Sequence, residues 1–354
     1  MADERCLMKG NEAIAAAAIR AGCSAYFGYP ITPQNEIANY MAQEMPEHGR
    51  IFLQAESETA AINMVYGAAA AGVRAMTSSS SPGVSLKQEG MSYAAGADLP
   101  LVLVNVMRGG PGLGSIAPAQ SDYFQTTRGG GHGDYRCIVL APKNVQECAD
   151  LTYLAFDLAE RYRMPAIILA DGMIGQMMEA VILPPGRDPS ALPRCNWAIG
   201  GMSASPREPR HITSLNLEPC ELDAQNTARF RRYDELAQSE TRFETVGDAD
   251  DSIVLAAYGT SARVAAGARE LAAQAGRKVS LFRPVSLFPF PSRELVDFTA
   301  GRPVLVVEMS CGQFIEDVKL AFFDSTRPSP VHLLAHSGGV VPTEDEVFQR
   351  LMTL

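Results

Sequence analysis

The sequence lacks the features that mark several common classes of protein. Its seven cysteines are odd in number and form no CxxC pair, so it predicts neither a disulfide framework nor a zinc or iron–sulfur site. Acidic residues (40) outnumber lysine and arginine (30), and the formal net charge is −10. Because neutralising phosphates requires clustered positive charge, this composition argues against a nucleic-acid surface.

Long apolar runs are also missing. No run approaches the roughly 20 residues that cross a bilayer, and residues 1–12 lack the apolar core of a signal peptide. We therefore expect a protein without a membrane span, in a reducing cytoplasm. Walker A, HExxH and GxSxG sequences are absent, and His132 and His211 are isolated, which is typical of surface or packing histidines.

What the sequence does contain is an alternation of short apolar runs and longer alanine-rich stretches. Strands are expected at residues 24–29, 74–77, 101–106, 137–141 and 166–171. Helices are expected at residues 34–45, 58–71, 84–97 and 145–161. The strands are nearly continuous apolar runs, as a parallel sheet covered on both faces requires. The pattern predicts an α/β doubly wound layer.

The composition changes near residue 183. Residues 183–210 are rich in proline, glycine and serine and lack periodicity, and a charged helix is expected over 221–243. A second alternation of strands and helices follows, with strands expected at 252–259, 279–284, 304–309 and 331–335. The expected organisation is a first domain over 1–185, an irregular connector with a bridging helix over 186–249, and a second α/β domain over 250–354.

Ligands of open parallel sheets bind beyond the carboxyl ends of the strands. Four loops at such ends are candidates: FGYPITP (27–33), QAESE (54–58), TSSSSPG (77–83) and MRGGPGLG (107–114). In the first, Gly28 permits an unusual turn and Pro30 stiffens it. Thr32 is expected to cap the following helix, with Pro33 at its first position.

Single residues in these loops leave two interpretations open. Arg108 is either a surface residue before a flexible turn or a clamp that holds a carboxylate by two hydrogen bonds. Glu56 and Glu58 either complement a helix dipole or, for Glu58 beside a small-residue helix, serve a chemical task. The serine run is either an anion cradle or a helix N-cap. MRGGPGLG does not have the spacing of a dinucleotide fingerprint.

Taken together, the loops resemble those of a known family. The similarity lies in the segments FGYPITP, QAESETAAINMVYGAAAAG, TSSSSPGVSLKQEG, NVMRGGPGLG, GHGDY and ADGMIGQMME, in this order. They look like the α subunit of 2-oxoacid:ferredoxin oxidoreductases of the separate-subunit type, for 2-oxoisovalerate (3-methyl-2-oxobutanoate) or 2-oxoglutarate. Residues 258–291 and 304–313 resemble the transketolase C-terminal-like domain of that family. The implied fold is a thiamine-diphosphate pyrimidine-binding-like domain followed by that second domain.

The resemblance also implies roles for particular residues. Glu58 matches the glutamate that contacts the aminopyrimidine of thiamine diphosphate, and Tyr29 and Pro30 are implied to bind the cofactor beside it. Arg108 matches the arginine that binds the carboxylate of the substrate, and Thr32 a threonine close to the reacting 2-oxo acid. The implied reaction is oxidative decarboxylation of a 2-oxo acid with coenzyme A, giving acyl-CoA, carbon dioxide and reduced ferredoxin.

The resemblance further implies that this chain holds only part of the active site. The GDG sequence that binds metal and diphosphate in such proteins is absent, and ADG at 170–172 departs from it. We therefore expect no metal ligand here. Mg²⁺ and the diphosphate are expected on a β subunit, [4Fe–4S] clusters on partner chains that include a ferredoxin-like δ subunit, and a γ subunit in addition.

Several alternatives stay open at this point. The same fold serves β-type subunits of lipoamide-linked 2-oxoacid dehydrogenases, and a non-catalytic assembly subunit is a further reading. A branched-chain substrate is favoured over 2-oxoglutarate, which needs a second cation for its distal carboxylate. Lys87, Arg128 and Arg136 are available for that purpose in sequence, although Lys87 is typical of a solvated helix residue.

Overall fold

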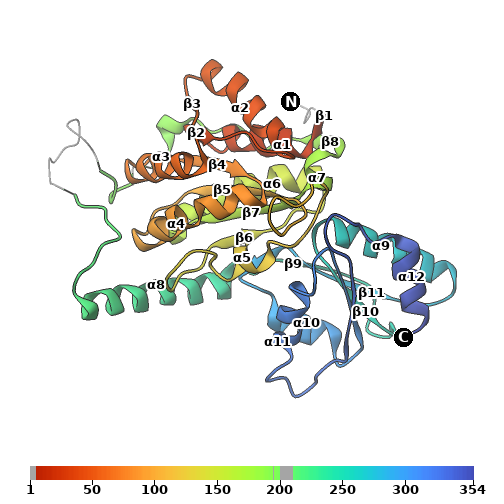
Figure 1. Cartoon of the computed structure of the whole chain (residues 1–354). Helices are drawn as coiled ribbons and strands as arrows, with labels where there is room; N and C mark the ends of the chain where they lie inside the picture. The colour runs from red at the N-terminus through yellow and green to blue at the C-terminus, as the bar shows by residue number, and fades with distance from the viewer. Residues whose placement is uncertain (1–4, 194, 200–209) are drawn as a thin grey trace.

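The computed structural model describes residues 5–193, 195–199 and 210–354 and shows two lobes (Figure 1). The first lobe is built on a seven-stranded sheet of order β12-β6-β7-β5-β4-β2-β3. Six of its strands run parallel: β2 (Ala25–Gly28), β3 (Ile51–Gln54), β4 (Ala75–Ser79), β5 (Val102–Met107), β6 (Ile138–Leu140) and β7 (Ala166–Asp171). The predicted doubly wound layer is confirmed.

Helices cover both faces of this sheet. One face carries α1 (Gly10–Arg20), α2 (Asn35–Glu47) and α6 (Val145–Tyr162), and the other carries α3 (Glu58–Ala70) and α4 (Ser81–Gly96). The packing of strand β5 explains why its sequence is a nearly continuous apolar run. Val102, Val104 and Val106 pack with α1, α2 and α6, whereas Leu103 packs with α3 and α4. Successive side chains point to opposite faces, so both must be apolar.

Several short elements escaped the sequence pattern. Strand β1 (Arg5–Lys9) pairs antiparallel with β8 (Met178–Ile182), and α5 (Tyr123–Thr127) and α7 (Gly172–Gln176) are single short helices. The expected irregular connector contains the 3-10 turn η1 (Pro189–Ala191), and the part of it at 194 and 200–209 lies outside the described residues. The predicted charged helix is α8 (Pro219–Ser239), which extends along the lower edge of the first lobe (Figure 1).

The second lobe is a five-stranded sheet of order β14-β13-β10-β11-β9. Its strands are β9 (Phe243–Val246), β10 (Val254–Ala256), β11 (Ser280–Pro284), β13 (Val304–Glu308) and β14 (Val331–Ala335). Only β9 runs antiparallel among them. The helices are α9 (Gly259–Gln274), α10 (Ser292–Thr299), α11 (Phe314–Ala321) and α12 (Glu344–Met352). The second predicted α/β alternation is therefore confirmed. Strand β9 was not predicted, and it begins at residue 243, which was expected to be the last residue of the charged helix.

The two lobes are joined by a strand and by buried polar contacts. Strand β12 (Ser286–Phe288) leaves the second lobe and pairs antiparallel with β6 at the edge of the first sheet. The Asp171 carboxylate accepts hydrogen bonds from the Thr260 amide at 3.0 Å and hydroxyl at 2.6 Å. It also accepts from the amides of Met173 and Ile174, which lie in the first turn of α7. Because its oxygens are occupied in this way, the aspartate of the ADG segment ties the lobes together.

Replacing Asp171 is therefore expected to destabilise the contact between the lobes. Asp171→Ala leaves buried donors of Thr260 and α7 without partners, each of which costs about 1–3 kcal/mol. We predict that the thermal unfolding midpoint of the subunit falls by about 5–10 °C, measured by calorimetry. Asp223→Ala, at an exposed position of α8, is the control. An equal effect of both substitutions would contradict this role for Asp171.

Candidate functional site

The candidate loops emerge at one edge of the first sheet. Strands β5, β4, β2 and β3 are neighbours in that order and run parallel, so their carboxyl ends lie together. Loops 107–114, 77–83 and 27–33 and the start of α3 follow these four ends. The structure thus brings together segments that are far apart in the sequence, and hydrogen bonds between the loops confirm their proximity.

Glu58 is the first residue of α3. Ser57 caps this helix, since its hydroxyl accepts from the Ala60 amide at 3.1 Å. This placement complements the helix dipole, as the simpler interpretation requires. The side chain is nevertheless buried, at 6% exposure, which a dipole alone does not demand. Glu56 is exposed, so the two carboxylates of the loop differ in environment.

The Glu58 carboxyl group lies directly against α4. A Cβ atom added at Gly83 would come within 2.6 Å of Glu58 Oε1 and 2.2 Å of Ser79 Oγ. Neither distance leaves room for a side chain at that position. Glycine at position 83 is therefore what allows the first turn of α4 to approach the carboxyl group.

The serine run joins the loops in an unexpected way. Ser80 occupies the N-cap position of α4, yet its side chain makes no capping bond. The hydroxyls of Ser79 and Ser80 are buried and lack partners within the described part of the chain. The Ser81 hydroxyl accepts from the Arg108 amide at 3.0 Å and donates to the Asp122 carboxylate at 2.6 Å. A simple capping role does not account for these contacts, and two hydroxyls are left over for a ligand.

Arg108 is buried, at 7% exposure, so the surface interpretation of this residue is wrong. Its Nη1 donates to the Thr32 carbonyl at 2.8 Å, and its Nη2 donates to the Leu113 carbonyl at 3.3 Å. The Nε atom is buried and has no partner among the described residues. The guanidinium therefore connects loops 27–33 and 107–114 and keeps one unsatisfied donor.

The start of the helix after the FGYPITP loop differs from the prediction. Helix α2 begins at Asn35 with Gln34 at the N-cap, so the prediction that Thr32 caps it and Pro33 opens it is wrong. The Thr32–Pro33 peptide bond is cis, and the exposed Thr32 hydroxyl lies 3.4 Å from Asn35 Nδ2. The loop holds Thr32 next to Arg108 before the helix begins.

Tyr29 and Pro30 precede Thr32 in the same loop. The Tyr29 carbonyl accepts from Gln34 Nε2 at 3.4 Å. Pro30 is exposed and lines a hollow of about 350 Å³ with residues of α2 and β3. In the described part of the chain no hydrogen bond joins either residue to Glu58, and their predicted cofactor role stays a prediction.

A larger cavity, of about 490 Å³, opens between the lobes beside Ser81. Its walls come from the first turn of α4, the glycines of loop 107–114 and α5, and from the second lobe at Cys311, Gln313, Ser337 and Gly338. The Ser115 hydroxyl donates to the Gly338 carbonyl at 3.0 Å. The second lobe thus fixes the loop that carries Arg108.

Lys87 is the functional candidate that sequence reasoning misjudged. It is fully buried on α4, whereas a solvated helix residue was expected. Its Nζ donates to the Glu58 main-chain carbonyl at 3.3 Å and to the Thr77 hydroxyl at 3.1 Å. Burial lowers the pKa of Lys87 to about 8, although the charge of Glu58 acts in the opposite direction. The flanking Gly83 was the available signal, because it permits a buried helix contact there.

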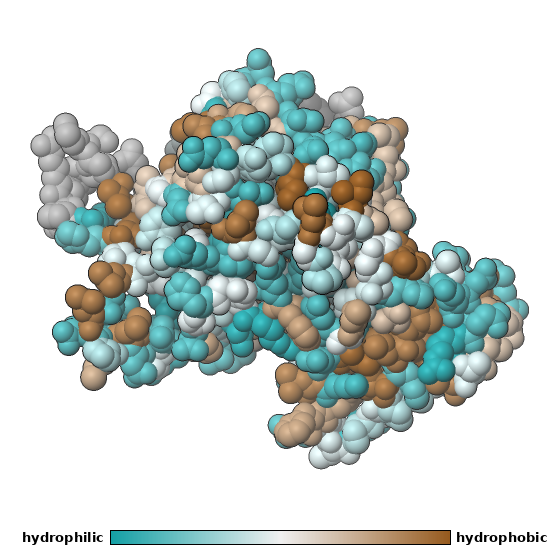
Figure 2. All heavy atoms as spheres, in the orientation of Figure 1, coloured by the Kyte–Doolittle hydropathy of each residue, from teal (hydrophilic) through white to brown (hydrophobic). Residues whose placement is uncertain are grey.

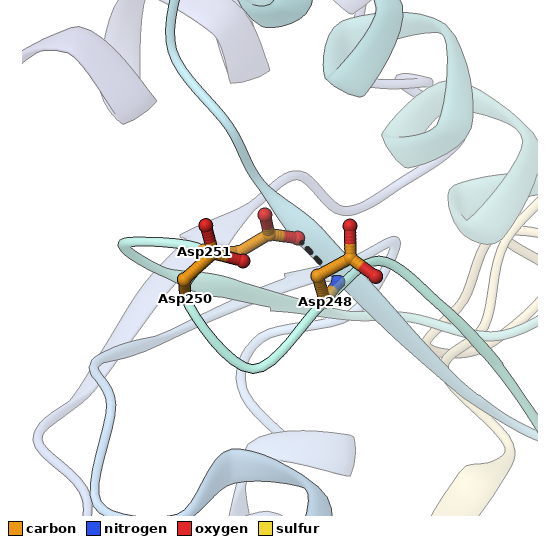
Figure 3. Close-up of side chains that lie close together, drawn as sticks. All are labelled: Asp248, Asp250 and Asp251. Carbon is orange, nitrogen blue, oxygen red and sulfur yellow. Dashed lines mark hydrogen bonds between the residues drawn. The ribbon is translucent and has the colours of Figure 1, made fainter.

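Other polar clusters have structural explanations. Asp248, Asp250 and Asp251 lie close together in the turn before β10 (Figure 3). Asp251 accepts from the Asp248 amide at 3.0 Å and from the Ser280 hydroxyl at 2.7 Å, and Asp250 pairs with Lys278 at 3.2 Å. These contacts close the turn and account for the carboxylates of Asp250 and Asp251, whereas Asp248 takes part through its main-chain amide.

The isolated histidines take no part in the site described above, whereas one cysteine, Cys311, lines the cavity between the lobes. His132 and His211 are both exposed, as predicted for surface histidines. All seven cysteines are free, and Cys23, Cys137 and Cys148 are buried. Among the described helices, none has the combination of length and apolar composition that a membrane crossing requires.

Comparison with protein families assigns the class. Residues 16–221 match the model described as "Pyruvate flavodoxin/ferredoxin oxidoreductase, thiamine diP-bdg", and residues 251–347 match "Pyruvate:ferredoxin oxidoreductase core domain II". The first match covers more than half of the chain and includes Thr32, Glu58 and Arg108. The chain belongs to the 2-oxoacid:ferredoxin oxidoreductase family, as the resemblance implied.

Individual relatives indicate which kind of subunit this chain is. The chain is 51% identical over 316 residues to ketoisovalerate oxidoreductase subunit VorB of Methanothermobacter marburgensis. The aligned region covers 89% of this chain and 89% of VorB. It is 40% identical over 324 residues to 2-oxoglutarate synthase subunit KorA of Archaeoglobus fulgidus, covering 88% of this chain and 90% of KorA. It is therefore an α-type subunit of an oxidoreductase.

Solved structures support the same fold. The 2-oxoglutarate:ferredoxin oxidoreductase of Magnetococcus marinus, solved with 2-oxoglutarate, coenzyme A and succinyl-CoA bound, superposes with a TM-score of 0.87 at 27% identity. The match covers 99% of this chain and 65% of the solved one. A split-gene transketolase, at 13% identity and a TM-score of 0.61, shows the likeness of fold alone.

The contact between Gly83 and Glu58 gives a direct test of the site. Gly83→Ala places a methyl group where the Glu58 carboxyl lies, so we predict at least about tenfold weaker binding of thiamine diphosphate by the assembled complex. Gly67→Ala on α3 is the matched control, because no atom lies within 4 Å of a Cβ there. Calorimetric titration measures both. Unchanged affinity in Gly83→Ala would place the cofactor elsewhere.

Proposed function

We propose that this chain is the α-type subunit of an enzyme that oxidatively decarboxylates a branched-chain 2-oxo acid, 3-methyl-2-oxobutanoate (ketoisovalerate). Coenzyme A accepts the acyl group, carbon dioxide leaves, and ferredoxin accepts the electrons. The identity to VorB subunits, 51% and 50% in two Methanothermobacter species, exceeds the 40% to KorA and supports this choice. The observation that carries the proposal is the buried Glu58 carboxyl group at the shared edge of the loops.

The three cations considered for a second substrate carboxylate are engaged elsewhere. Arg128 pairs with Asp317 at 2.8 Å. Arg136 lies over the Phe288 ring at 5.9 Å. Lys87 donates to groups on α3 and β4 and is sealed from solvent. This arrangement supports an apolar substrate over 2-oxoglutarate, which remains the second candidate because of the KorA relatives.

The residues around Glu58 suit a thiamine ring. A buried carboxyl group beside the unpartnered hydroxyls of Ser79 and Ser80 offers polar partners to a heterocycle, and Gly83 keeps the space open. Bound thiamine diphosphate would supply the nucleophilic carbon and the electron sink that decarboxylation needs. Glu58 is proposed to hold a proton between its carboxyl oxygen and the ring nitrogen and to orient the ring. Tyr29 and Pro30 are proposed to bind the cofactor beside Glu58.

Arg108 and Thr32 are proposed to hold the substrate. The Arg108 Nε donor is buried and unsatisfied among the described residues, and Thr32 presents its hydroxyl from the adjoining loop. A guanidinium suits a carboxylate because both are planar and can form two parallel hydrogen bonds. Binding the carboxylate there would orient the bond to be broken next to the cofactor.

Partner chains are proposed to complete the site. Asp171 is committed to Thr260 and α7, and this supports placing Mg²⁺ and the diphosphate on a β subunit. Leu113 and Ile116, on the loop after β5, are 84% and 67% exposed, as expected of residues that another chain covers. Figure 2 shows hydrophobic side chains on the viewed face of both lobes. A γ subunit and a ferredoxin-like δ subunit with [4Fe–4S] clusters complete the proposed assembly, in the cytoplasm.

The proposed division of the chain follows its two sheets. Residues 1–185 form the pyrimidine-binding domain, 186–249 the connector with its bridging helix, and 250–354 the transketolase C-terminal-like domain. Strand β12 crosses this division and supports close cooperation of the two domains.

Turnover assays of the purified complex test the proposed function. We expect reduction of ferredoxin or viologen, dependent on coenzyme A, with kcat/KM for 3-methyl-2-oxobutanoate at least about 100-fold above that for 2-oxoglutarate. A preference for 2-oxoglutarate would favour the KorA-like alternative. Activity only with lipoamide would indicate a lipoamide-linked dehydrogenase, and a complex without turnover would indicate an assembly subunit.

Substitutions separate the roles of the two site residues. Glu58→Ala is expected to lower kcat by about 10²–10⁴-fold, the usual scale for acid–base assistance. Arg108→Ala is expected to raise KM by about 10–100-fold, since it removes charge-assisted hydrogen bonds. Steady-state kinetics of the assembled complex measure both. Glu56→Ala is the control at an exposed carboxylate, and near-normal kcat in Glu58→Ala would reject the assignment.

A further inference from the structure

The carboxyl group of Asp122 has no role in the function proposed above. Asp122 occupies the N-cap position of α5, yet its side chain makes no capping hydrogen bond there. Its Oδ2 atom instead accepts from the Ser81 hydroxyl at 2.6 Å and from Asn105 Nδ2 at 2.9 Å. Ser81 begins α4, and Asn105 is fully buried on β5. One carboxyl oxygen therefore joins three elements at the edge of the sheet.

Asn105 fixes the direction of these hydrogen bonds. Its Oδ1 accepts from the Ser81 amide at 3.2 Å, so the other end of its side chain is the amino group, which donates to Asp122. Asp122 Oδ2 is thus an acceptor, whether or not the second oxygen of the carboxyl group carries a proton. The arrangement depends on the position of this oxygen rather than on charge.

The Ser81 hydroxyl extends the arrangement to Arg108. A hydroxyl group has one hydrogen to donate, and two acceptors lie within its reach, Asp122 Oδ2 at 2.6 Å and the Arg108 carbonyl at 3.2 Å. Donation to the nearer one, Asp122, leaves the hydroxyl oxygen to accept from the Arg108 amide at 3.0 Å. Without Asp122, the hydroxyl is free to turn towards the Arg108 carbonyl.

The main chain of Arg108 determines where its guanidinium group lies. The Ser81 hydroxyl holds the amide of Arg108, and a β-bridge joins the residue to Pro118. From this position, Nη1 reaches the Thr32 carbonyl at 2.8 Å, and the buried Nε has no partner among the described residues. Because substrate positioning is sensitive to displacements of about 1 Å, the support of this main chain matters for a carboxylate clamp.

We infer that Asp122 is a positioning residue for Arg108. Through Ser81 it fixes the main chain that carries the guanidinium group, and so the place where the carboxylate of the substrate binds. The inference rests on the proposed function of Arg108. Asp122 lines the cavity between the lobes and acts on the substrate through Arg108 alone, and this dependence distinguishes positioning from a general loss of structure.

A double-mutant cycle tests this dependence in the assembled complex. Asp122→Ala is expected to raise KM for the 2-oxo acid about tenfold, with a smaller change in kcat. In an Arg108→Ala background, the same substitution is expected to change KM by less than about twofold, because the group that it positions is gone. Asp324→Ala, at an exposed position of the second lobe, is the control. An unchanged KM, or an equal rise in both backgrounds, would overturn the inference.

The conservative variant and a measurement without turnover complete the test. Asp122→Asn keeps an acceptor oxygen for Ser81 and Asn105, so a KM close to that of the wild type is expected. Amide hydrogen exchange of the peptide that contains Arg108, followed by mass spectrometry, is expected to be about tenfold faster at this amide in Asp122→Ala and unchanged in Asp122→Asn. Wild-type exchange in Asp122→Ala would contradict the inference.

A further variant covers the case in which Asp122→Ala does not assemble. Ser81→Ala leaves Asp122 in place and removes the hydroxyl that links it to Arg108, so the same rise in KM and the same faster exchange are expected. Wild-type values in Ser81→Ala would overturn the inference and leave the proposed function intact. An unchanged KM in Arg108→Ala alone would reject the proposed role of Arg108, and this inference with it.

Discussion

The close approach of α4 to the first turn of α3 is the contact on which the site depends. It exists because position 83 carries no side chain, so the Glu58 carboxyl group can lie buried against the helix rather than turn to solvent. A carboxyl group that is buried among neutral groups needs either a proton or a counter-charge. Lys87 lies at the same contact, where its Nζ donates to the Glu58 main-chain carbonyl.

The rest of the first lobe brings other loops to that contact. Parallel strands place their carboxyl ends at one edge, and Arg108 then ties the loop after β5 to the loop after β2 through the Thr32 carbonyl. The second lobe acts at a distance from Glu58, because Ser115 and Gly338 hold the loop that carries Arg108. Its role is thus more specific than packing alone, although it supplies no residue to the proposed acid–base pair.

Much of this arrangement could be predicted from the sequence. Continuous apolar runs indicated a sheet covered on both sides, and β5 shows the two-sided packing that such runs require. The short elements β1, β9 and β12 were missed because their stability comes from pairing with distant strands rather than from a local pattern. The predicted cap at Thr32 was wrong because local propensity does not determine where a helix starts when the preceding loop is held by tertiary contacts.

The site was predictable in part. Residue type and position in the loops selected Glu58 and Arg108 as candidates, but did not predict the burial of Arg108 or of Lys87, since burial depends on helix packing across the sheet face. The central claim is that the Glu58 carboxyl group binds the ring of thiamine diphosphate. An experimental structure of the assembled complex with the cofactor tests it most directly. The account predicts a Glu58 carboxyl oxygen within about 3.2 Å of a ring nitrogen, and a ring bound away from Glu58 would contradict it.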